Sequence, residues 1–422
     1  MKMKRFWKLS TIAAVAVMTI LPAFTSEDNF LNAGEPPASN SIRLDSYQRQ
    51  MLENNNDFAC DLFRTINEQK KGDGSIIVSP ISVSYMLGML ERGADGETYQ
   101  QIANVLRLGD SNEEVNRYFK KIIEEAPNVD SKVTVKIANC ININSARNIS
   151  LIPQYKTDMQ KYYNAQVDVL DFRSSGSLYR INNWCKTNTN GMIPSILDRL
   201  EPNALMYMLN AVYFKATWTE KFDPNATRDM IFTKQDGTKV KSKMMHLKTK
   251  AAYGENALYK VLRLPYGNGG YSMYVLLPHK GTTINDVIQT LSAQRLKQLQ
   301  KSELTTHEVD ILMPRFTTAS TTDLKGVLSS MGMPLAFNDC CAEFSKMAES
   351  RDNLYVSMMK QSAKIEVDEE GTKAAAVTVA EVKNRSAAPS QGYTFHATRP
   401  FVYYIAENST GMILFMGTYC GD

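Results

Sequence analysis

The stretch "KIEVDEEGTKAAAVT", from Lys364 to Thr378, decides the fold of this 422-residue chain. Its first half has the residues of a strand, and its second half is rich in alanine. Lys373 to Ala376 taken alone would favour a helix. If residues 372–383 form a strand instead, successive side chains point to opposite faces.

The two faces of such a strand differ in character. One face holds small or uncharged residues: Thr372, Ala374, Ala376, Thr378, Ala380 and Val382. The other face holds all three charges, on Lys373, Glu381 and Lys383. A slip of one residue would bury those charges. The pattern favours a central strand with one buried and one wet face, although three charges share a parity by chance about one time in four.

A cleavable bond follows this segment. Arg385 precedes Ser386, and alanine, proline, serine and glycine residues come after them. Proteases that cut after arginine would accept this bond. The segment therefore has the residues of a loop in one state and of a strand in another.

The N-terminus has the pattern of a secretory signal peptide over residues 1–25. Lys2, Lys4, Arg5 and Lys8 precede the apolar run from Leu9 to Phe24, and small residues follow. The alternative is a short retained anchor, but sixteen apolar residues are few for a spanning helix. We expect a secreted protein, extracellular or periplasmic, without a stable membrane anchor.

Removal of this peptide changes the charge of the chain. The full chain carries 48 basic and 44 acidic residues, and four of the basic residues lie in the signal peptide, so the remainder is neutral (44 − 44). The basic isoelectric point is therefore no sign of nucleic-acid binding. Residues 26–50 are polar, contain "GEPPASNS", and are interpreted as a linker or N-terminal arm.

The rest of the chain, residues 51–422, mixes helical and strand-like patterns without strict alternation. "GSIIVSP" predicts a short buried strand, and "SVSYMLGMLERGA" predicts a helix that ends at Gly93. "EVDILMPRF" predicts a strand, and "GNGG" at 267–270 predicts a hairpin turn. The order of elements argues against a doubly wound parallel sheet and favours one α+β domain.

No pattern of catalytic residues is present. The chain lacks the HExxH, GxSxG and GxxxxGK[ST] motifs, and its four histidines are scattered. Its six cysteines form no CxxC pair, and we expect several to be free, buried thiols. We therefore expect no enzyme, no cofactor and no metal, although a triad assembled from distant positions is not excluded by sequence.

Eight ordered motifs make the chain from about residue 55 similar to the serpins, the serine protease inhibitor family. They include "IIVSPISVSYMLGMLERGADGETYQQI", "LNAVYFKATWTEKFDP", "MPRFTTASTTDL", "KIEVDEEGTKAAAVT" and "RPFVYYIAENSTGMILFMG". The resemblance implies about three β-sheets, eight to nine helices and an exposed reactive-centre loop near the C-terminus.

The resemblance also implies a mechanism of inhibition. A serine protease attacks the loop and forms a covalent acyl complex, the cut loop inserts into the main sheet, and the distorted protease is trapped. Small residues on one face of the loop would be easy to bury in that sheet. We expect a monomer whose partner is a serine protease.

Family spacing places the reactive bond sixteen residues after Glu369, at Arg385–Ser386 (369 + 16 = 385). Arginine at that position indicates trypsin-like proteases. Lys383 is an alternative bait, and Val379 and Val382 would suit elastase-like proteases less well. The loop hinge then comprises Glu369, Glu370, Gly371, Thr372, Lys373, Ala374, Ala375 and Ala376.

The resemblance assigns a sheet-opening cluster to Ser79, Ser82, Asn210, Gln361 and Trp218, with Trp218 at the top of the sheet where insertion begins. The chain departs from the family at four places: Lys373 replaces the usual glutamate, Gln361 replaces histidine, Thr398 replaces an acid or amide, and the segment after Arg385 is longer. The longer segment puts the attacked bond in question.

Two alternatives stay open. The chain could be a non-inhibitory serpin that acts as a carrier or chaperone, or a broad-range inhibitor that also traps elastase-like or cysteine proteases. Non-inhibitory members tend to carry bulky residues, charges or proline at positions that match 372–376, whereas this chain has Thr-Lys-Ala-Ala-Ala. The small residues favour inhibition.

Overall fold

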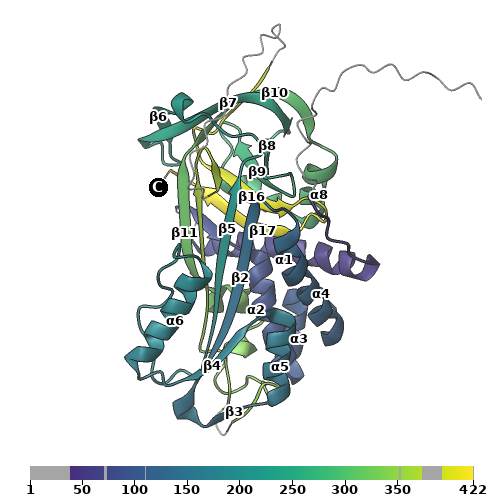
Figure 1. The fold of residues 1–422 in the computed structure, drawn as a ribbon, viewed down its shortest axis with the longest axis vertical. Helices are drawn as coiled ribbons and strands as arrows, with labels where there is room; N and C mark the ends of the chain where they lie inside the picture. Colours follow the sequence, from purple (N-terminus) through teal and green to yellow (C-terminus); the bar gives the residue numbers. More distant parts are fainter. Residues whose placement is uncertain (1–38, 71–73, 110, 351–352, 373–391, 422) are drawn as a thin grey trace, which may run out of the picture. The chain divides into compact units, whose positions relative to one another are not determined.

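Nine α-helices and three β-sheets form the part of the chain that the computed structural model describes, residues 39–70, 74–109, 111–350, 353–372 and 392–421 (Figure 1). These residues belong to one compact unit, residues 38–422. The predicted α+β class with about three sheets and eight to nine helices is confirmed. The predicted signal peptide lies outside the described residues.

The helices have the following bounds. The α-helices are α1 Ser46–Gln69, α2 Pro80–Gly93, α3 Gly96–Leu106, α4 Asn112–Glu125, α5 Pro153–Tyr163, α6 Ser175–Asn188, α7 Ile284–Gln289, α8 Ala293–Lys301 and α9 Leu324–Ser330. Four 3₁₀ turns accompany them: Ala126–Asn128, Ser145–Arg147, Pro224–Ala226 and Leu335–Phe337.

The strands are β1 Ile76–Val78, β2 Val133–Asn144, β3 Ile149–Leu151, β4 Gln166–Leu170, β5 Met206–Thr217, β6 Arg228–Thr233, β7 Lys239–Glu255, β8 Tyr259–Tyr266 and β9 Tyr271–Pro278. They continue with β10 Thr305–Pro314, β11 Phe316–Asp323, β12 Ala348–Ser350, β13 Met358–Val367, β14 Gly371–Thr372, β15 Tyr393–His396, β16 Phe401–Glu407 and β17 Ile413–Tyr419.

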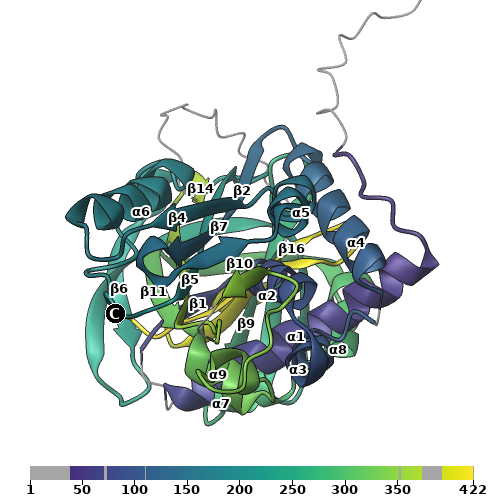
Figure 2. The same cartoon turned by 90° about the horizontal axis from the view of Figure 1, so that it is seen from below.

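The six-stranded sheet has the order β11-β13-β14-β5-β2-β4 and is buried on both faces around β5. Alternate residues of β5 enter two different cores: Tyr207 and Leu209 pack in the cluster that includes α6, and Met206 and Met208 pack in the main core with α2. The two-residue period of a strand explains this division. Figures 1 and 2 show α6 set apart from the other helices.

The nine-stranded sheet has the order β1-β17-β16-β9-β8-β7-β10-β15, with β6 paired to β7. Its strand β15 is an edge strand that pairs only with β10 among the described residues, parallel, from Val309↔Tyr393 to Leu312↔His396. β3 and β12 form the third sheet.

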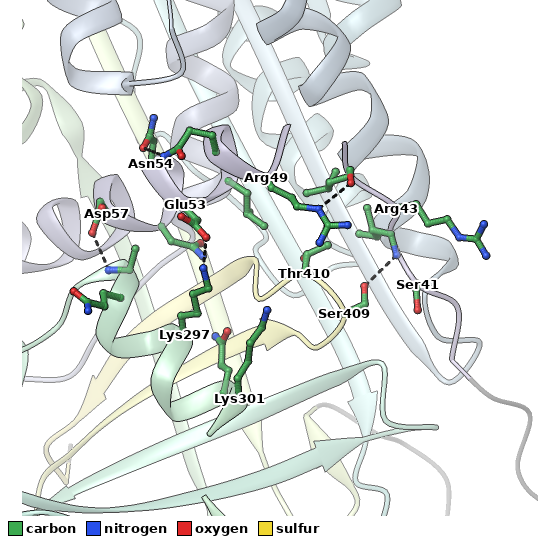
Figure 3. Close-up of a pocket in the computed structure, with 18 residues that line it drawn as sticks. Ser41, Arg43, Arg49, Glu53, Asn54, Asp57, Lys297, Lys301, Ser409 and Thr410 are labelled. Carbon is green, nitrogen blue, oxygen red and sulfur yellow. Dashed lines mark hydrogen bonds and ion pairs between the residues drawn. The ribbon is translucent and has the colours of Figure 1, made fainter. Parts of the chain in front are cut away.

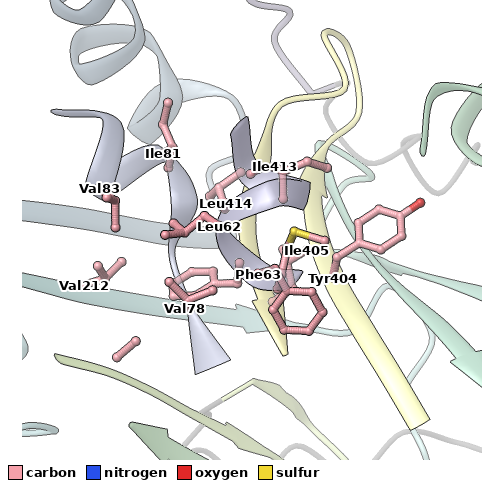
Figure 4. Close-up of a cluster of buried hydrophobic side chains, with 14 of the residues drawn as sticks. Leu62, Phe63, Val78, Ile81, Val83, Val212, Tyr404, Ile405, Ile413 and Leu414 are labelled. Atoms are coloured by element: carbon pink, nitrogen blue, oxygen red, sulfur yellow. The ribbon is translucent and has the colours of Figure 1, made fainter. Parts of the chain in front are cut away.

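The main core lies where α1 and α2 meet β1, β5, β16 and β17 (Figure 4). Figure 4 shows Phe63 of α1 and Val78 of β1 close to Ile405 and Leu414 of the β16–β17 hairpin. Helix α2 is buried almost all round, which its apolar and small residues permit. This core fixes β1 and α2 beside the six-stranded sheet.

The local predictions agree with the structure at most positions. The predicted short strand and helix are β1 and α2, and residues 267–270 form the turn between β8 and β9. The strand-like run "EVDILMPRF" is in strand at every position except Arg315, since β10 ends at Pro314 and β11 begins at Phe316. Helix α1 begins at Ser46, inside the segment interpreted as an arm, where Asp45 and Gln48 form a capping box.

Candidate functional site

The loop hinge begins with a tight turn that joins β13 to β14. The Asp368 carboxylate accepts hydrogen bonds from the backbone N–H groups of Glu370 (2.9 Å) and Gly371 (3.2 Å). Trp218 holds the same turn from β5: its indole Nε1–H donates to the Asp368 carbonyl (2.9 Å), and its backbone N–H donates to the Glu370 carbonyl (2.9 Å). Burial raises the pKa of Asp368.

Glu369 is buried in this turn, with 5% of its side chain exposed, and its carboxylate has two partners. The Arg315 guanidinium lies 2.6 Å from it, and the Thr227 hydroxyl donates to it. Glu370 is paired with Lys221. A buried carboxylate requires such partners, so the chain direction at the end of β13 is fixed by charge as well as by packing.

Thr372 ends the described part of the hinge, and it lies inside the six-stranded sheet. It pairs with Val367 of β13 on one side and with Ala216 of β5 on the other, both antiparallel. Its side chain is fully buried, and its hydroxyl lies 2.7 Å from the Tyr266 hydroxyl. Tyr266 in turn stacks on Trp218, with ring centroids 4.4 Å apart.

Gly371 is required at its position. It has a φ of +146°, and a Cβ built there would lie 2.1 Å from the Ala216 carbonyl oxygen. No other residue allows the backbone to approach β5 this closely. Gly371 therefore permits the hinge to enter between the two strands.

β13 and β5 diverge as they approach the hinge. They pair directly, in parallel, only from Met358↔Tyr207 to Ala363↔Val212. Residues 364–366 of β13 have no partner on β5 in the described register, and β14 fills the space between the strands one step further on. The sheet is thus closed at one end and already opened by the hinge at the other.

A buried polar cluster lies at the closed end. Gln361 and Asn210 face each other in the register, with Gln361 Nε2 donating to Asn210 Oδ1 (3.1 Å). Gln361 also bonds both backbone groups of Ser79, whose hydroxyl lies 2.8 Å from that of Ser82. Asn210 donates to Asn139 of β2 (3.0 Å). These contacts connect α2, β2, β5 and β13 through hydrogen bonds.

The structure brings together Ser79, Ser82, Asn210 and Gln361, but it places Trp218 at the hinge and not in this cluster. Of the predicted hinge, Glu369, Glu370, Gly371 and Thr372 are described. The remaining loop positions lie outside the described residues: Lys373, Ala374, Ala375, Ala376, Lys383, Arg385 and Ser386.

After residues 373–391, the described chain resumes and enters β15 of the nine-stranded sheet. Asp310 of β10 joins two histidines on the neighbouring strands: His246 of β7 lies 2.6 Å from one carboxylate oxygen, and His396 of β15 lies 2.8 Å from the other. Burial alone would raise the pKa of Asp310, but the hydrogen bonds and charge of the two histidines hold it below its ordinary value.

Sequence reasoning missed Arg315, Thr227, Tyr266 and Asn139. Arg315 lies within the quoted motif "MPRF", so a charged residue between two strands was a usable signal. The other three are polar or aromatic residues inside strand-like runs or a turn, and only the three-dimensional contact shows their role.

A separate cavity of about 750 Å³ lies between residues 41–44, α1, α8 and the turn after β16 (Figure 3). Lys297 of α8 pairs with Glu53 of α1, and Asp57 accepts from the Ala293 backbone N–H (2.8 Å). Figure 3 shows Lys301 on the same helix as Lys297, beside the open space. The lining is thus mixed in charge and close to the protein surface.

Cys60, Cys140 and Cys185 are buried thiols. The pKa values of these three thiols are raised by burial, which keeps them protonated. Over the described ranges, no helix has the length and apolar character needed to cross a bilayer.

The chain was compared with known families and proteins. The profile of the family described as serpin (serine protease inhibitor) matches residues 53–421. Leukocyte elastase inhibitor A of Rattus norvegicus is 32% identical over 382 residues, which cover 88% of this chain and 99% of the relative.

Two solved structures have similar folds. The thermophilic serpin tengpin in its native state has a TM-score of 0.82 and 30% identity, over 94% of this chain and 99% of its own. Thyroxine-binding globulin complexed with thyroxine has a TM-score of 0.78 and 27% identity, over 87% of this chain and 98% of its own.

Proposed function

Since the chain belongs to the serpin family of serine protease inhibitors, we propose that it is a suicide-substrate inhibitor of trypsin-like serine proteases. The observation that carries this proposal is the buried Thr372, paired between β13 and β5 at the point where they diverge. A hinge that already lies between these strands is suited to continue into the sheet after cleavage.

The proposed reaction uses the protease's own chemistry. The protease serine attacks the Arg385 carbonyl, the bond to Ser386 breaks, the Ser386 nitrogen leaves as a protonated amine, and an ester joins the protease to Arg385. Insertion of residues 373–385 beside β5 then carries the esterified protease along the sheet before water cleaves the ester. The partner complex is covalent, and the free inhibitor is a monomer.

The specificity rests on the sequence of the loop. Arg385 suits the acidic pocket of trypsin-like proteases, and Lys383 is the alternative bait. The similarity to a leukocyte elastase inhibitor supports a broader range as the alternative. Val379 and Val382 would then be the residues that elastase-like proteases accept, and cysteine proteases would be a further class.

The proposed location is outside the cell or in the periplasm. This follows from the charged start and apolar run of residues 1–25, together with the protease partner. Mass spectrometry of the protein recovered from the culture medium or periplasm of its host would test it. An N-terminus near residue 26 is expected, and an intact Met1 on a cell-retained protein would contradict it.

The first experiment mixes the purified protein with trypsin and separates the products on a denaturing gel. We expect a band at the summed mass in the wild type, its loss in Arg385→Ala, and its persistence in Lys383→Ala. A cut chain with fully active trypsin would contradict inhibition. A band that persists in Arg385→Ala and disappears in Lys383→Ala would show that the reactive bond is the one after Lys383.

The second candidate function is a carrier of small molecules. It is favoured by the cavity of about 750 Å³ and by the similarity to thyroxine-binding globulin. Thyroxine itself is a suitable probe, with binding followed by protein fluorescence. Saturable binding that is weakened by Lys297→Ala but unchanged by Arg385→Ala, with no covalent trypsin complex, would favour the carrier.

A further inference from the structure

A second cavity lies beside β15 and is lined mainly by basic groups. It has a volume of about 380 Å³, within the range of small-molecule sites. Five basic side chains from three stretches of the chain line it: Lys260, His279, Lys280, His396 and Arg399. No acidic residue lines this cavity in the part of the chain that is described. The cavity between α1 and α8 differs, because two acids, Glu53 and Asp57, line it beside two lysines and two arginines, and Glu53 pairs with Lys297.

Arg399 and Lys260 of this cavity have neutral partners, whereas His396 pairs with the Asp310 carboxylate. Arg399 donates from Nε to the Pro278 carbonyl (2.8 Å), and the Lys260 ammonium donates to the Thr394 carbonyl (3.0 Å). Neither these two side chains nor Lys280 forms an ion pair within the described ranges. Burial lowers the pKa of Arg399, because its charge is partly removed from water without an anion beside it.

Two carboxylates near the cavity already have hydrogen-bond partners, and one of these partners, His396, lines the cavity itself. Asp310 accepts from His246 and His396. Glu255 lies opposite Lys260 in the β7–β8 register, but its carboxylate accepts a hydrogen bond from the Tyr253 hydroxyl (2.7 Å). The cavity therefore keeps an excess of positive charge, and several N–H donors of Arg399 and Lys280 stay available.

We propose that this cavity, which we call the β15 basic pocket (Lys260, His279, Lys280, His396 and Arg399), binds an oxyanion of the phosphate or sulfate class. Arginine and lysine together suit such a group, because the guanidinium gives paired donors and the ammonium gives a compact charge. His279 and His396 add further ring nitrogens to the lining. The occupied pocket would join β8 and the segments after β9 and β15 through one ligand.

The test titrates inorganic phosphate into the full-length protein by calorimetry, at constant ionic strength. We expect saturable binding with one site per chain. Lys280→Gln, at an exposed position, should weaken the affinity about fivefold, since one charged contact is lost. Arg399→Gln should abolish saturation, and circular dichroism checks that this variant is folded.

Lys241→Gln is the matched control, because Lys241 is an exposed lysine on β7 outside the pocket. It should leave phosphate affinity unchanged. An absence of saturable binding in the wild type would overturn the proposal. A loss of phosphate affinity in Lys241→Gln equal to that in Lys280→Gln would also overturn the proposal. Attraction to the basic surface as a whole would then account for the binding.

Two sources of the anion are separated by competition with dextran sulfate. Displacement of phosphate by the polymer, lost in Lys280→Gln, assigns the pocket to sulfate esters on a polysaccharide. Phosphate binding that the polymer does not displace assigns it to a free anion. Both results support the pocket, and neither readout depends on protease inhibition.

Discussion

Thr372 is the residue on which the proposed insertion depends. Its small side chain is fully buried against Tyr266. A carboxylate there would be removed from water beside the Tyr266 hydroxyl, so we expect Thr372→Glu to slow insertion. The fraction of chain that trypsin cuts, relative to the fraction trapped in the covalent complex, should rise several-fold on a denaturing gel.

Lys373→Glu is the matched control for Thr372→Glu. It introduces the same side chain one position along, on the face that the sequence pattern predicts to be wet. Trapping should be close to that of the wild type. Equal loss of trapping in both variants would contradict the two-faced pattern of the segment.

Arg315 is the second residue with a measurable role. It is the cationic partner of the buried Glu369 carboxylate. Arg315→Met leaves that carboxylate with the Thr227 hydroxyl alone, which should lower the free energy of unfolding by about 1–3 kcal/mol. Urea unfolding measures the change.

The comparison for Arg315→Met is Lys364→Met. Lys364 pairs with Glu366 on β13, the strand that leads into the turn of Glu369, but both side chains are partly exposed. Loss of such a pair should lower the free energy of unfolding by less than about 1 kcal/mol. Equal effects would mean that Glu369 is not held by its ion pair.

Among the elements, β14 depends on the close approach of Gly371 to β5. A Cβ there would collide with the Ala216 carbonyl oxygen, so Gly371→Ala should push β14 out of the sheet. Trp218, which donates to the Asp368 carbonyl, would then be exposed. We expect a red shift of tryptophan emission and a loss of stability of more than about 1 kcal/mol.

Gly237→Ala separates this collision from simple backbone strain. Gly237 also has a positive φ, of +83°, but a Cβ there would meet no atom within 4 Å. The Gly237→Ala variant should lose some stability without any change in tryptophan emission. An emission shift in Gly237→Ala, or none in Gly371→Ala, would contradict the role of the hinge glycine.

Strand β15 is an edge strand whose side chains supplement its short pairing with β10. Since the pKa of Asp310 is lowered in the folded protein, this carboxylate stabilises the fold at pH values above its unfolded pKa of about 3.9. That contribution is lost as the pH falls through the lower folded pKa. Asp310→Asn should therefore lower the free energy of unfolding near pH 6.5. The difference in this free energy between wild type and variant should shrink below about pH 4.

The pH dependence of Asp310→Asn is measured by urea unfolding at both pH values, with Asp229→Asn beside it. Asp229 is an exposed partner of Lys243 on the β6–β7 hairpin, with no histidine. Its substitution should have a small effect at either pH. A constant difference between wild type and Asp310→Asn across the range would contradict the histidine contacts.

At the scale of the whole molecule, the sequence was sufficient for the fold class. Ser79, Ser82, Asn210 and Gln361 are named from the ordered motifs and meet in the structure, while their role in sheet opening stays a prediction. Trp218 was grouped with these residues as part of a sheet-opening cluster, and in the structure it contacts the hinge turn instead. Its indole reaches the Asp368 carbonyl, a contact across 150 residues that no local pattern reveals.

The division of "EVDILMPRF" into two strands shows a second limit. The run predicts strand, but it gives no sign that the chain changes sheet at Arg315, whose partner is the distant Glu369. The same holds for Gly371, whose need for a glycine comes from the Ala216 carbonyl on β5. Long-range contacts decide these positions, and periodicity carries no information about them.

The pairing of β13 with β5 predicts which residues of an inserting strand would face which residues of these two strands. Thr372 pairs with Val367 and Ala216, so an antiparallel continuation would bring residue 378 opposite Gln361 (367 − 6) and Asn210 (216 − 6). Those two amides now bond to each other. A strand that separates them removes the donor to Asn210 Oδ1, while Gln361 keeps its two bonds to Ser79, and the hydroxyl of Thr378 could provide a new donor.

In this register, the buried Gln361–Asn210 pair must separate when the inserting loop is about halfway into the sheet. Thr378→Val has nearly the same shape but cannot replace the broken bond between Gln361 and Asn210. We expect it to stall entry at this step, so that rapid-quench gels with trypsin show slower trapping and more released, cleaved chain. In the proposed mechanism, insertion begins at Thr372 and the open end of the sheet, and we expect the amide pair to influence whether it finishes before the ester is hydrolysed.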